Sequence, residues 1–239
     1  LILRKGIPVS PKLQQNVKLY TYSGADGGDF HAENIRIAQG EIIFDFVTPT
    51  IIIRDLKLGV PVLVNVENSI AAMAVAFLNG VTEDELRTGI ASFQGIRRRF
   101  DFHVKKENMV YLDDYAHHPT ELTQSINSIK ALFPTKKVCG IFQPHLYTRT
   151  RDFYKEFSEA LSLLDELILL DIYPAREQPI EGVSSQLIFD KVMCKNKTLC
   201  TKQELMDELP NHQFDVLVTL GAGDIDKFIP EITAYCKNL

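Results

Sequence analysis

The chain has 239 residues, of which 45% are hydrophobic and 24% are charged, with a formal net charge of -5 and a pI near 5.7. This length allows two modest domains that each bury a core, and the acidic balance argues against a nucleic-acid-binding protein. No apolar run approaches the roughly 18 residues of a membrane span and no signal peptide opens the chain, so we expect a cytoplasmic protein without a membrane partner.

The cysteines indicate a reducing compartment. Cys139, Cys194, Cys200 and Cys236 show no C-x-x-C spacing and lie in or beside apolar segments. We expect free thiols rather than a disulfide or metal framework.

Residues 1–58 alternate short β-rich runs with turn signals. The runs cover residues 17–22, 34–38, 42–47 and 51–56. Their period-two patterning and Gly-containing connections predict antiparallel strands. The Gly-rich turn at residues 23–28 has neither the lysine nor the following helix of a phosphate-binding loop, so we interpret it as a plain turn.

Two helices follow, the first from Asn65 and the second from a Thr82 cap. Apolar residues recur at helical spacing after Asn65 until Asn79 and Gly80, which form a C-terminal stop. In the simplest interpretation Asn65 is an N-cap and Asn68 is a polar residue of the first turn. Their side-chain amides also offer the donor and acceptor pair that an adenine edge requires, so both interpretations stay open.

Three consecutive arginines occupy residues 97–99, at the seam where a β-rich run over residues 100–106 begins. A solvated charge run is the ordinary explanation. A position between domains also suits phosphate or ribose binding, because a guanidinium group holds such a ligand with a fixed pair of hydrogen bonds. We place the boundary near residue 98, which gives domains 1–98 and 99–239.

Apolar strands and amphipathic helices alternate from residue 109 to the end. We expect strands at residues 109–113, 137–142, 166–170 and 214–220, a short run near Leu199, and helices at 120–133, 151–164, 184–194, 202–209 and 226–235. This alternation predicts an α/β domain with a mostly parallel, Rossmann-like sheet and helices on both faces. A partial domain with antiparallel strands and two helices would precede it.

Unusual polar residues follow three of these strands, in loops at residues 113–118, 143–149 and 173–177. Right-handed crossovers place the ends of parallel strands on one edge of a sheet, so the three loops should converge. Pro119 suits the first turn of the next helix, with His118 or Thr120 near its cap.

The converging loops supply cationic and hydrogen-bond-donating side chains. These are His117, His118, His145, Arg149 and Arg176. An arginine fork matches a carboxylate, so an amino-acid carboxylate is the natural ligand. The histidines and Asp114 also admit a zinc site, although adjacent histidines do not normally face one ion and no Cys or H-x-x-x-H spacing supports it.

Five segments of the chain resemble motifs of the ATP-dependent Mur ligases, and their order and spacing along the chain agree with that family. The most specific is Asp-Asp-Tyr-Ala-His-His-Pro-Thr-Glu at residues 113–121. The others are Gly-Ile-Arg-Arg-Arg-Phe at 95–100, Phe-Gln-Pro-His-Leu-Tyr-Thr-Arg-Thr at 142–150, Asp-Ile-Tyr-Pro-Ala-Arg-Glu at 171–177 and Gly-Ala-Gly-Asp at 221–224. Residues 65–72 also resemble the family's adenine-contacting stretch, with Val64 in place of its usual histidine.

The resemblance implies ATP-dependent amide-bond formation through an acyl phosphate, with ATP and Mg²⁺ as cofactors. The form of residues 143–150 indicates the branch that joins L-alanine to UDP-N-acetylmuramate. On this basis we assign catalysis to His117, His145 and Arg149, the substrate to Tyr115, His118, Arg149 and Arg176, and the nucleotide to Asn65, Asn68, Arg98 and Asp114. Leu146 stands where some members have arginine, so the substrate grip would rest on fewer charges.

The sequence contains no G-x-x-x-x-G-K-[ST] phosphate loop, which the resemblance would place before residue 1. Since the chain also begins with Leu1, we expect a C-terminal fragment that is inactive alone. Two alternatives remain: a murein-peptide recycling ligase that attaches a tripeptide, and a non-catalytic nucleotide-binding module. The segment 221–224 is either an anion-binding nest or a plain strand-to-helix turn.

Overall fold

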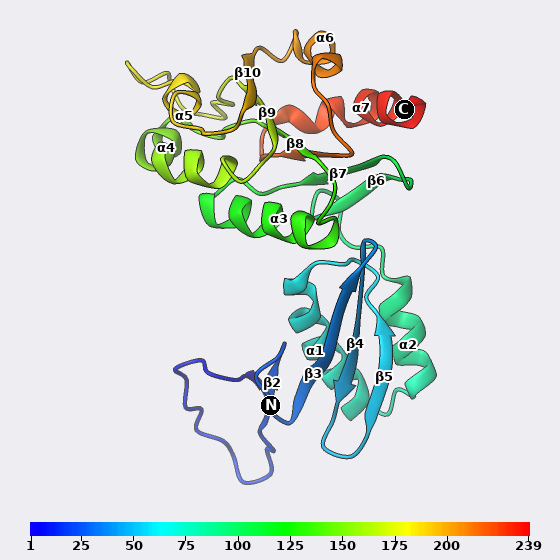
Figure 1. Ribbon diagram of the computed structural model, residues 1–239. Helices are drawn as coiled ribbons and strands as arrows, with labels where there is room; N and C mark the ends of the chain where they lie inside the picture. Colours follow the sequence, from blue (N-terminus) through cyan, green and yellow to red (C-terminus); the bar gives the residue numbers. More distant parts are fainter. The chain divides into compact units, whose positions relative to one another are not determined.

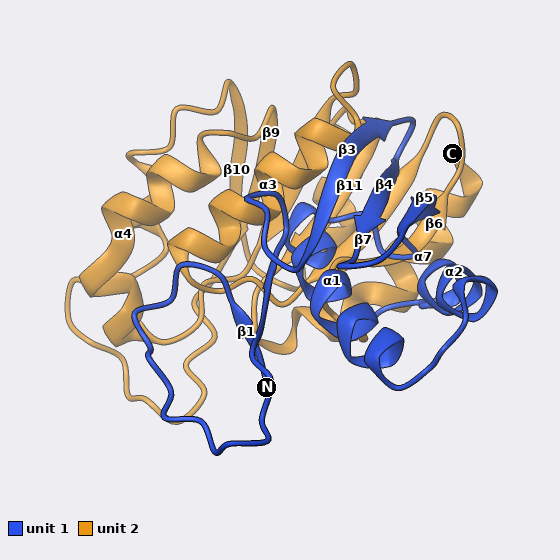
Figure 2. Ribbon diagram, turned by 90° about the horizontal axis from the view of Figure 1, so that it is seen from below, with its two compact units in different colours: residues 1–95 blue, residues 96–239 orange.

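A computed structural model describes residues 1–239 and forms two compact units, residues 1–95 and residues 96–239 (Figures 1 and 2). The division lies close to the boundary expected near residue 98. Each unit contains its own sheet, and together they confirm the α/β class. None of the helices has the length and apolar character needed to cross a membrane.

Unit 1 contains one five-stranded sheet in the order β1-β2-β3-β4-β5 and two helices. The elements are β1 (Ile2–Arg4), β2 (Tyr20–Ser23), β3 (Phe30–Ala38), β4 (Glu41–Val47), β5 (Ile52–Lys57), α1 (Leu63–Leu78) and α2 (Glu83–Ser92). The antiparallel prediction holds for β3, β4 and β5 but is wrong for β2, which runs parallel to both β1 and β3. Alternating hydrophobicity defines which face is buried, and it is the same for either strand direction.

The helices of unit 1 begin and end largely where local chemistry dictates. Thr82 caps α2 in a capping box with Glu85, and Gly80 follows α1 with φ of 84°, a left-handed conformation that favours glycine. The N-cap interpretation of Asn65 is wrong, because α1 begins at Leu63 and Val62 is its cap residue without a side-chain hydrogen bond. Apolar residues ahead of Asn65 extend the helix backwards.

Unit 2 contains a six-stranded sheet in the order β10-β9-β8-β11-β7-β6. Its strands are β6 (Asp101–Lys105), β7 (Val110–Asp114), β8 (Val138–Phe142), β9 (Glu166–Leu170), β10 (Asn196–Cys200) and β11 (Val216–Leu220). All pairs are parallel except β6 with β7. The mostly parallel sheet is therefore confirmed, and β7, β8, β9 and β11 end on the same edge, which we call the carboxyl edge.

Helices cover both faces of this sheet, with α3 and α4 along one face and α6 and α7 along the other (Figure 1). The helices are α3 (Pro119–Leu132), α4 (Tyr147–Leu161), α5 (Gln186–Phe189), α6 (Leu205–Glu208) and α7 (Ile229–Asn238), with short 3-10 turns η1 (Leu209–Asn211) and η2 (Asp224–Phe228). One core packs Tyr111, Ile141 and Ile168 of the strands against Ile232 of α7. The strands β8, β9 and β11 are buried at every position, so their side chains pack against a helical layer on each face of the sheet.

Four helix predictions need correction. The helix expected over 226–235 is α7, which begins only at Ile229 because the 3-10 turn η2 covers the expected start. The helix expected from residue 151 begins at Tyr147, that expected over 184–194 is only Gln186–Phe189, and that expected over 202–209 is α6 continued by η1. Helix α4 starts early because Thr148 at its first turn is held by Glu177 from another loop. Such contacts between distant segments are absent from local patterns.

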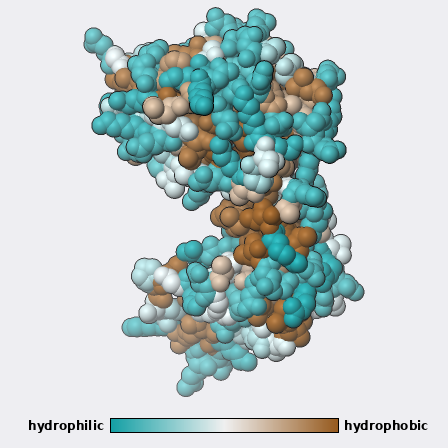
Figure 3. Space-filling model, in the orientation of Figure 1, coloured by the Kyte–Doolittle hydropathy of each residue, from teal (hydrophilic) through white to brown (hydrophobic).

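The surface visible in Figure 3 is largely hydrophilic, with hydrophobic residues in separate patches. All four cysteines are free, and Cys139, Cys194 and Cys236 are buried. Burial raises the pKa of the Cys236 thiol to about 12, so this sulfur stays protonated.

Candidate functional site

The loops that follow β8 and β9 are joined directly at the carboxyl edge of unit 2. The Leu146 amide donates to the Tyr173 carbonyl at 2.9 Å, and the Tyr173 amide donates to the Pro144 carbonyl at 2.8 Å. This short parallel bridge pairs His145 with Tyr173. Backbone hydrogen bonds therefore join two of the three polar loops to each other.

Aromatic side chains connect the loop after β7 to this pair. The Tyr115 and His117 rings lie 5.2 Å apart, the His117 and His145 rings 6.1 Å apart, and the His145 ring stacks on Tyr173 at 5.7 Å. The topology thus brings together the three loops, as expected for parallel strands, although β11 separates β7 from β8 within the sheet. We call His117, His145, Arg149 and Tyr173 the histidine cluster.

Arg149 stands on the first turn of α4 with no acidic partner. Its Nη1 atom lies 3.4 Å from His145 Nδ1, and no carboxylate lies within ion-pair distance. Burial, the Arg149 charge and His117 lower the pKa of His145, while Glu177 acts in the opposite sense. A neutral imidazole beside an unpaired guanidinium is suited to a ligand that has both a carboxylate and an amine.

Two predicted substrate residues lie outside this cluster. His118 is the N-cap of α3, where its Nδ1 accepts from the Thr120 amide at 3.4 Å and its ring contacts Phe153 at 5.1 Å. The Glu121 carboxylate completes this capping box. Arg176 is exposed and makes no hydrogen bond or ion pair. The structure therefore brings neither residue into the histidine cluster.

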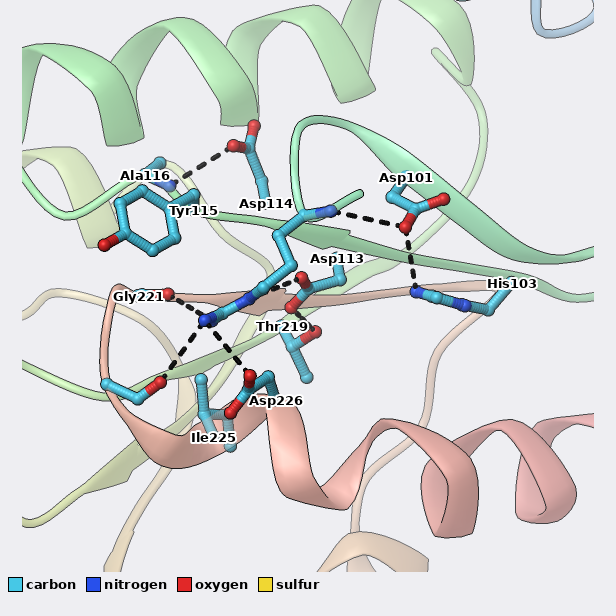
Figure 4. Close-up of polar contacts among 12 residues, drawn as sticks. Asp101, His103, Asp113, Asp114, Tyr115, Ala116, Thr219, Gly221, Ile225 and Asp226 are labelled. Atoms are coloured by element: carbon cyan, nitrogen blue, oxygen red, sulfur yellow. Dashed lines mark hydrogen bonds and ion pairs between the residues drawn. The ribbon is translucent and has the colours of Figure 1, made fainter. Parts of the chain in front are cut away.

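The adjacent carboxylates of β7 point to opposite faces of the sheet, because side chains alternate along a strand. Asp114 faces α3 and accepts from the Ser125 hydroxyl at 2.7 Å, whereas Asp113 faces the other side and accepts from Thr219 at 2.6 Å (Figure 4). Burial raises the pKa of both carboxyl groups, although these hydrogen bonds counteract it. The Asp-Asp pair is thus two separate sites.

Arg98 is largely engaged within unit 2. Its Nε donates to Asp113 at 3.3 Å and its Nη2 donates to the Gly221 carbonyl at 2.7 Å. Its Nη1 lies 3.4 Å from the Gly223 carbonyl and 3.5 Å from Asp226 (Figure 4). The assignment of Arg98 to the nucleotide is not tested by these contacts and stays a prediction, but they give the side chain a structural use that the sequence did not indicate.

The turn at residues 221–224 serves close packing. A Cβ atom on Gly221 would lie 2.6 Å from the Gln143 carbonyl oxygen, and one on Gly223 would lie 2.3 Å from Gln143 Oε1. Gln143 itself donates to Asp224 at 2.9 Å and accepts from the Ile225 amide at 3.0 Å. Since the Gly221 and Gly223 carbonyls face Arg98, the structure favours the plain turn over an anion nest.

The predicted adenine contacts lie in unit 1, on the first turns of α1. The Asn65 amide group donates to the Val60 carbonyl at 3.3 Å, and Asn68 donates to Asn65 Oδ1 at 3.3 Å. Asn68 is exposed. The two amides therefore form a small polar pair on the helix, and their role towards a nucleotide remains a prediction.

Sequence reasoning assigned no role to Glu177, Tyr173 or Gln143. Glu177 accepts from the Thr148 amide at 3.0 Å and so fixes the first turn of α4 beside Arg149. The only sequence feature that pointed to Glu177 is its position in the third polar loop. Gln143 is buried directly after a fully apolar strand, and a buried amide at such a position indicates a hydrogen-bonding role.

Comparisons with known proteins agree with this architecture. A family model described as Mur ligase, glutamate ligase domain, matches residues 98–223. The UDP-N-acetylmuramate--L-alanine ligase of Parabacteroides distasonis is 59% identical over 240 residues, covering 100% of this chain and 52% of its own length. The chain thus spans about half the length of the curated relatives that it matches.

Solved structures show the same fold at lower identity. The UDP-N-acetylmuramate-alanine ligase of Thermotoga maritima matches with a TM-score of 0.72 and 24% identity, over 90% of this chain and 48% of that one. MurF ligase from the same organism, solved in complex with ADP, matches with a TM-score of 0.62 and 18% identity, over 92% and 49%.

The parallel sheet with its polar carboxyl edge defines an α/β domain of the kind that binds ligands at strand ends. The family match covers most of that domain. The chain belongs to the Mur ligase family.

Proposed function

We propose that this chain contributes to an ATP-dependent ligase that joins L-alanine to UDP-N-acetylmuramate in peptidoglycan precursor synthesis. The observation that supports it best is Arg149, a guanidinium without an acidic partner that lies beside the His145 imidazole. The name of the 59% identical relative points to the same reaction. In this proposal ATP converts the muramate carboxylate to an acyl phosphate, which the amine of L-alanine attacks.

The histidine cluster has distinct tasks in this reaction. Arg149 binds the alanine carboxylate through two hydrogen bonds, and His117 and His145 face the amine and the reacting carbonyl. Tyr115 lies against His117 and bounds the same space. Positioning and electrostatic stabilisation would provide most of the lowering of the barrier, since the leaving phosphate needs little further activation. His118 and Arg176 lie outside the histidine cluster and would make only a minor contribution to substrate binding.

The nucleotide would be held by Asn65, Asn68 and Asp114, with unit 1 as the C-terminal part of the central ATP-binding domain. An ADP complex of a structural neighbour supports a nucleotide in this fold. Mg²⁺ would accompany ATP as its counter-ion. The enzyme would work in the cytoplasm, where its nucleotide substrates are made.

The test is phosphate release from ATP in the presence of UDP-N-acetylmuramate and L-alanine. The 239-residue chain should show no turnover, because it contains no phosphate loop, whereas the complete polypeptide encoded by its gene should be active. A preference for a murein tripeptide over L-alanine would assign it to peptide recycling instead. Nucleotide binding without turnover of either substrate would indicate a non-catalytic module.

A further inference from the structure

Arg98 has an enclosed position that its two neighbours do not share. Arg97 and Arg99 are exposed, whereas the Arg98 side chain is only 19% exposed. Its three nitrogen atoms all have partners, and these come from the end of β7 and from the turn after β11. One residue therefore joins two strand ends that are more than 100 positions apart in the sequence.

The backbone of Arg98 is held as firmly as its side chain. Its φ is 62°, a left-handed conformation that is costly for a residue with a Cβ atom. Two hydrogen bonds maintain it: the Arg98 amide donates to Asp101 at 3.3 Å, and the Arg98 carbonyl accepts from the Tyr115 amide at 2.7 Å. Such strained residues persist where the surrounding contacts determine the geometry of a site.

A continuous set of contacts leads from Arg98 to the histidine cluster. The Arg98 guanidinium lies 5.1 Å from the centre of the Tyr115 ring, which it approaches face on. Tyr115 contacts His117, and His117 contacts His145. Arg98 therefore fixes Tyr115 twice, once through the backbone and once through the ring.

We propose that Arg98 is a positioning residue for the ligase reaction, which holds Tyr115 and through it His117 in place, and that it is not a ligand of the nucleotide. This inference rests on the proposed function. A nucleotide ligand needs a guanidinium free to turn towards phosphate, whereas Arg98 would first have to leave Asp113 and two carbonyl groups. Asp113 would then be a buried carboxylate without its cation.

The first measurement needs no activity. Amide hydrogen exchange by NMR on the 239-residue chain compares wild type with Arg98→Gln, Arg98→Lys and the exposed control Arg97→Gln. We expect exchange of the Tyr115 amide to become about tenfold faster in Arg98→Gln and less so in Arg98→Lys, with Arg97→Gln unchanged. Unchanged protection in both Arg98 variants would overturn the proposal. If Arg98→Gln does not fold, Arg98→Lys decides alone.

The second measurement uses the active, complete polypeptide. A positioning role predicts that kcat falls about tenfold in Arg98→Gln, with partial recovery in Arg98→Lys and a Michaelis constant for ATP within about twofold of wild type. A large rise in the constant for ATP with unchanged kcat would make Arg98 a nucleotide ligand and refute the proposal. A complete polypeptide without ligase activity would refute the proposed function, while the exchange measurement would still decide whether Arg98 holds Tyr115.

Discussion

The two edges of the unit 2 sheet use similar residues in opposite ways. At the amino edge, where β9 begins, the buried Glu166 carboxylate accepts from His212 Nδ1 at 2.7 Å, Asn196 Nδ2 at 2.8 Å and the Gln213 amide at 3.2 Å, and it pairs with Lys137. At the carboxyl edge, Arg149 has one hydrogen-bond partner, His145, and forms no ion pair. Each edge thus places an imidazole beside a charged side chain. The charged group has an oppositely charged partner at the amino edge but not at the carboxyl edge.

The difference indicates that the amino edge stabilises the fold, whereas the carboxyl edge is available for a ligand. A buried carboxylate with four donors stabilises the fold only as long as all partners remain, because any loss leaves an unpaired charge in the interior. An unpaired guanidinium on the partly exposed first turn of a helix contributes little to folding but is ready for an anionic ligand. Changes at the amino edge should therefore lower stability, and changes at the histidine cluster should lower activity.

Glu166→Ala should give the largest effect. Removing this carboxylate leaves the buried His212 without its closest acceptor, and breaking a buried pair of this kind costs about 3 to 5 kcal/mol. The free energy of unfolding of unit 2, measured by urea denaturation with circular dichroism, should fall by this amount. The exposed Glu159→Ala on α4 is the control and should change it by less than about 0.5 kcal/mol.

The pH dependence of the same group gives a second check. Burial opposes ionisation of Glu166, but the Lys137, Gln213 and His212 hydrogen bonds outweigh it and lower the pKa of the carboxyl group. A lowered folded pKa means stability that is present above the ordinary value of 4.5 and is lost as pH falls below it. Glu166→Gln should flatten this acid decline. An equally steep decline in the variant would contradict the assignment.

Arg149→Lys is the corresponding change at the carboxyl edge. Lysine keeps the charge but loses the bidentate geometry, so about 1.5 to 3 kcal/mol of substrate binding is at stake. In the complete polypeptide the Michaelis constant for L-alanine should rise about 10- to 100-fold, while that for ATP moves little. Arg151→Lys, an exposed arginine on the same helix, is the control. An unchanged constant for L-alanine in folded Arg149→Lys would remove Arg149 from the substrate site.

Much of this contrast could be predicted from the sequence. The order of strands and helices, the Pro119 start of α3 and the convergence of the polar loops follow from local patterns and the handedness of crossovers. The engagement of Arg98 could not be predicted, because three consecutive arginines look alike and its partners lie 123 and 125 positions away. A positive φ at Arg98 or Leu146 is likewise set by tertiary contacts.

The adjacent carboxylates are an instructive intermediate case. Strand alternation predicts that Asp113 and Asp114 face opposite sides of the sheet, but the apolar pattern ends the strand at Asp113 and so assigns both residues to one polar loop, whereas β7 continues to Asp114. The end of a strand is the least certain part of any sequence pattern. At a site built on strand ends, a shift of one residue changes which side chain faces the ligand.

Gly221→Ala should sharpen the comparison by disturbing the carboxyl edge through packing alone. Gly221 has φ of 133°, and its added methyl group would meet the Gln143 carbonyl. Strain of this kind costs about 1 to 3 kcal/mol. Urea denaturation should show this loss, and Gly89→Ala, whose Cβ would meet nothing within 4 Å, should not. Equal stability of both variants would mean that the turn relaxes freely.

The smallest expected effect concerns the titration of His145. Burial, Arg149 and His117 lower its pKa below the ordinary value of 6.5, so folding favours the neutral imidazole. A lowered folded pKa contributes stability that is complete above the ordinary value and declines as pH falls through it. In the proposed reaction, the neutral form would also be the one able to accept a proton from the amine of L-alanine near neutral pH.

Arg149→Gln distinguishes the effect of the Arg149 charge on the pKa of His145 from the effect of burial. It removes the nearby cation, so the His145 titration midpoint, followed by NMR of the imidazole ring in the 239-residue chain, should move upwards. The shift should be modest, because burial is the larger cause and remains in the variant. Arg151→Gln, which removes an exposed charge already paired with Asp152, should leave the midpoint unchanged. A His145 midpoint identical in wild type and Arg149→Gln would show that the guanidinium does not act on this imidazole, and the histidine cluster would then be a packing arrangement rather than an electrostatic one.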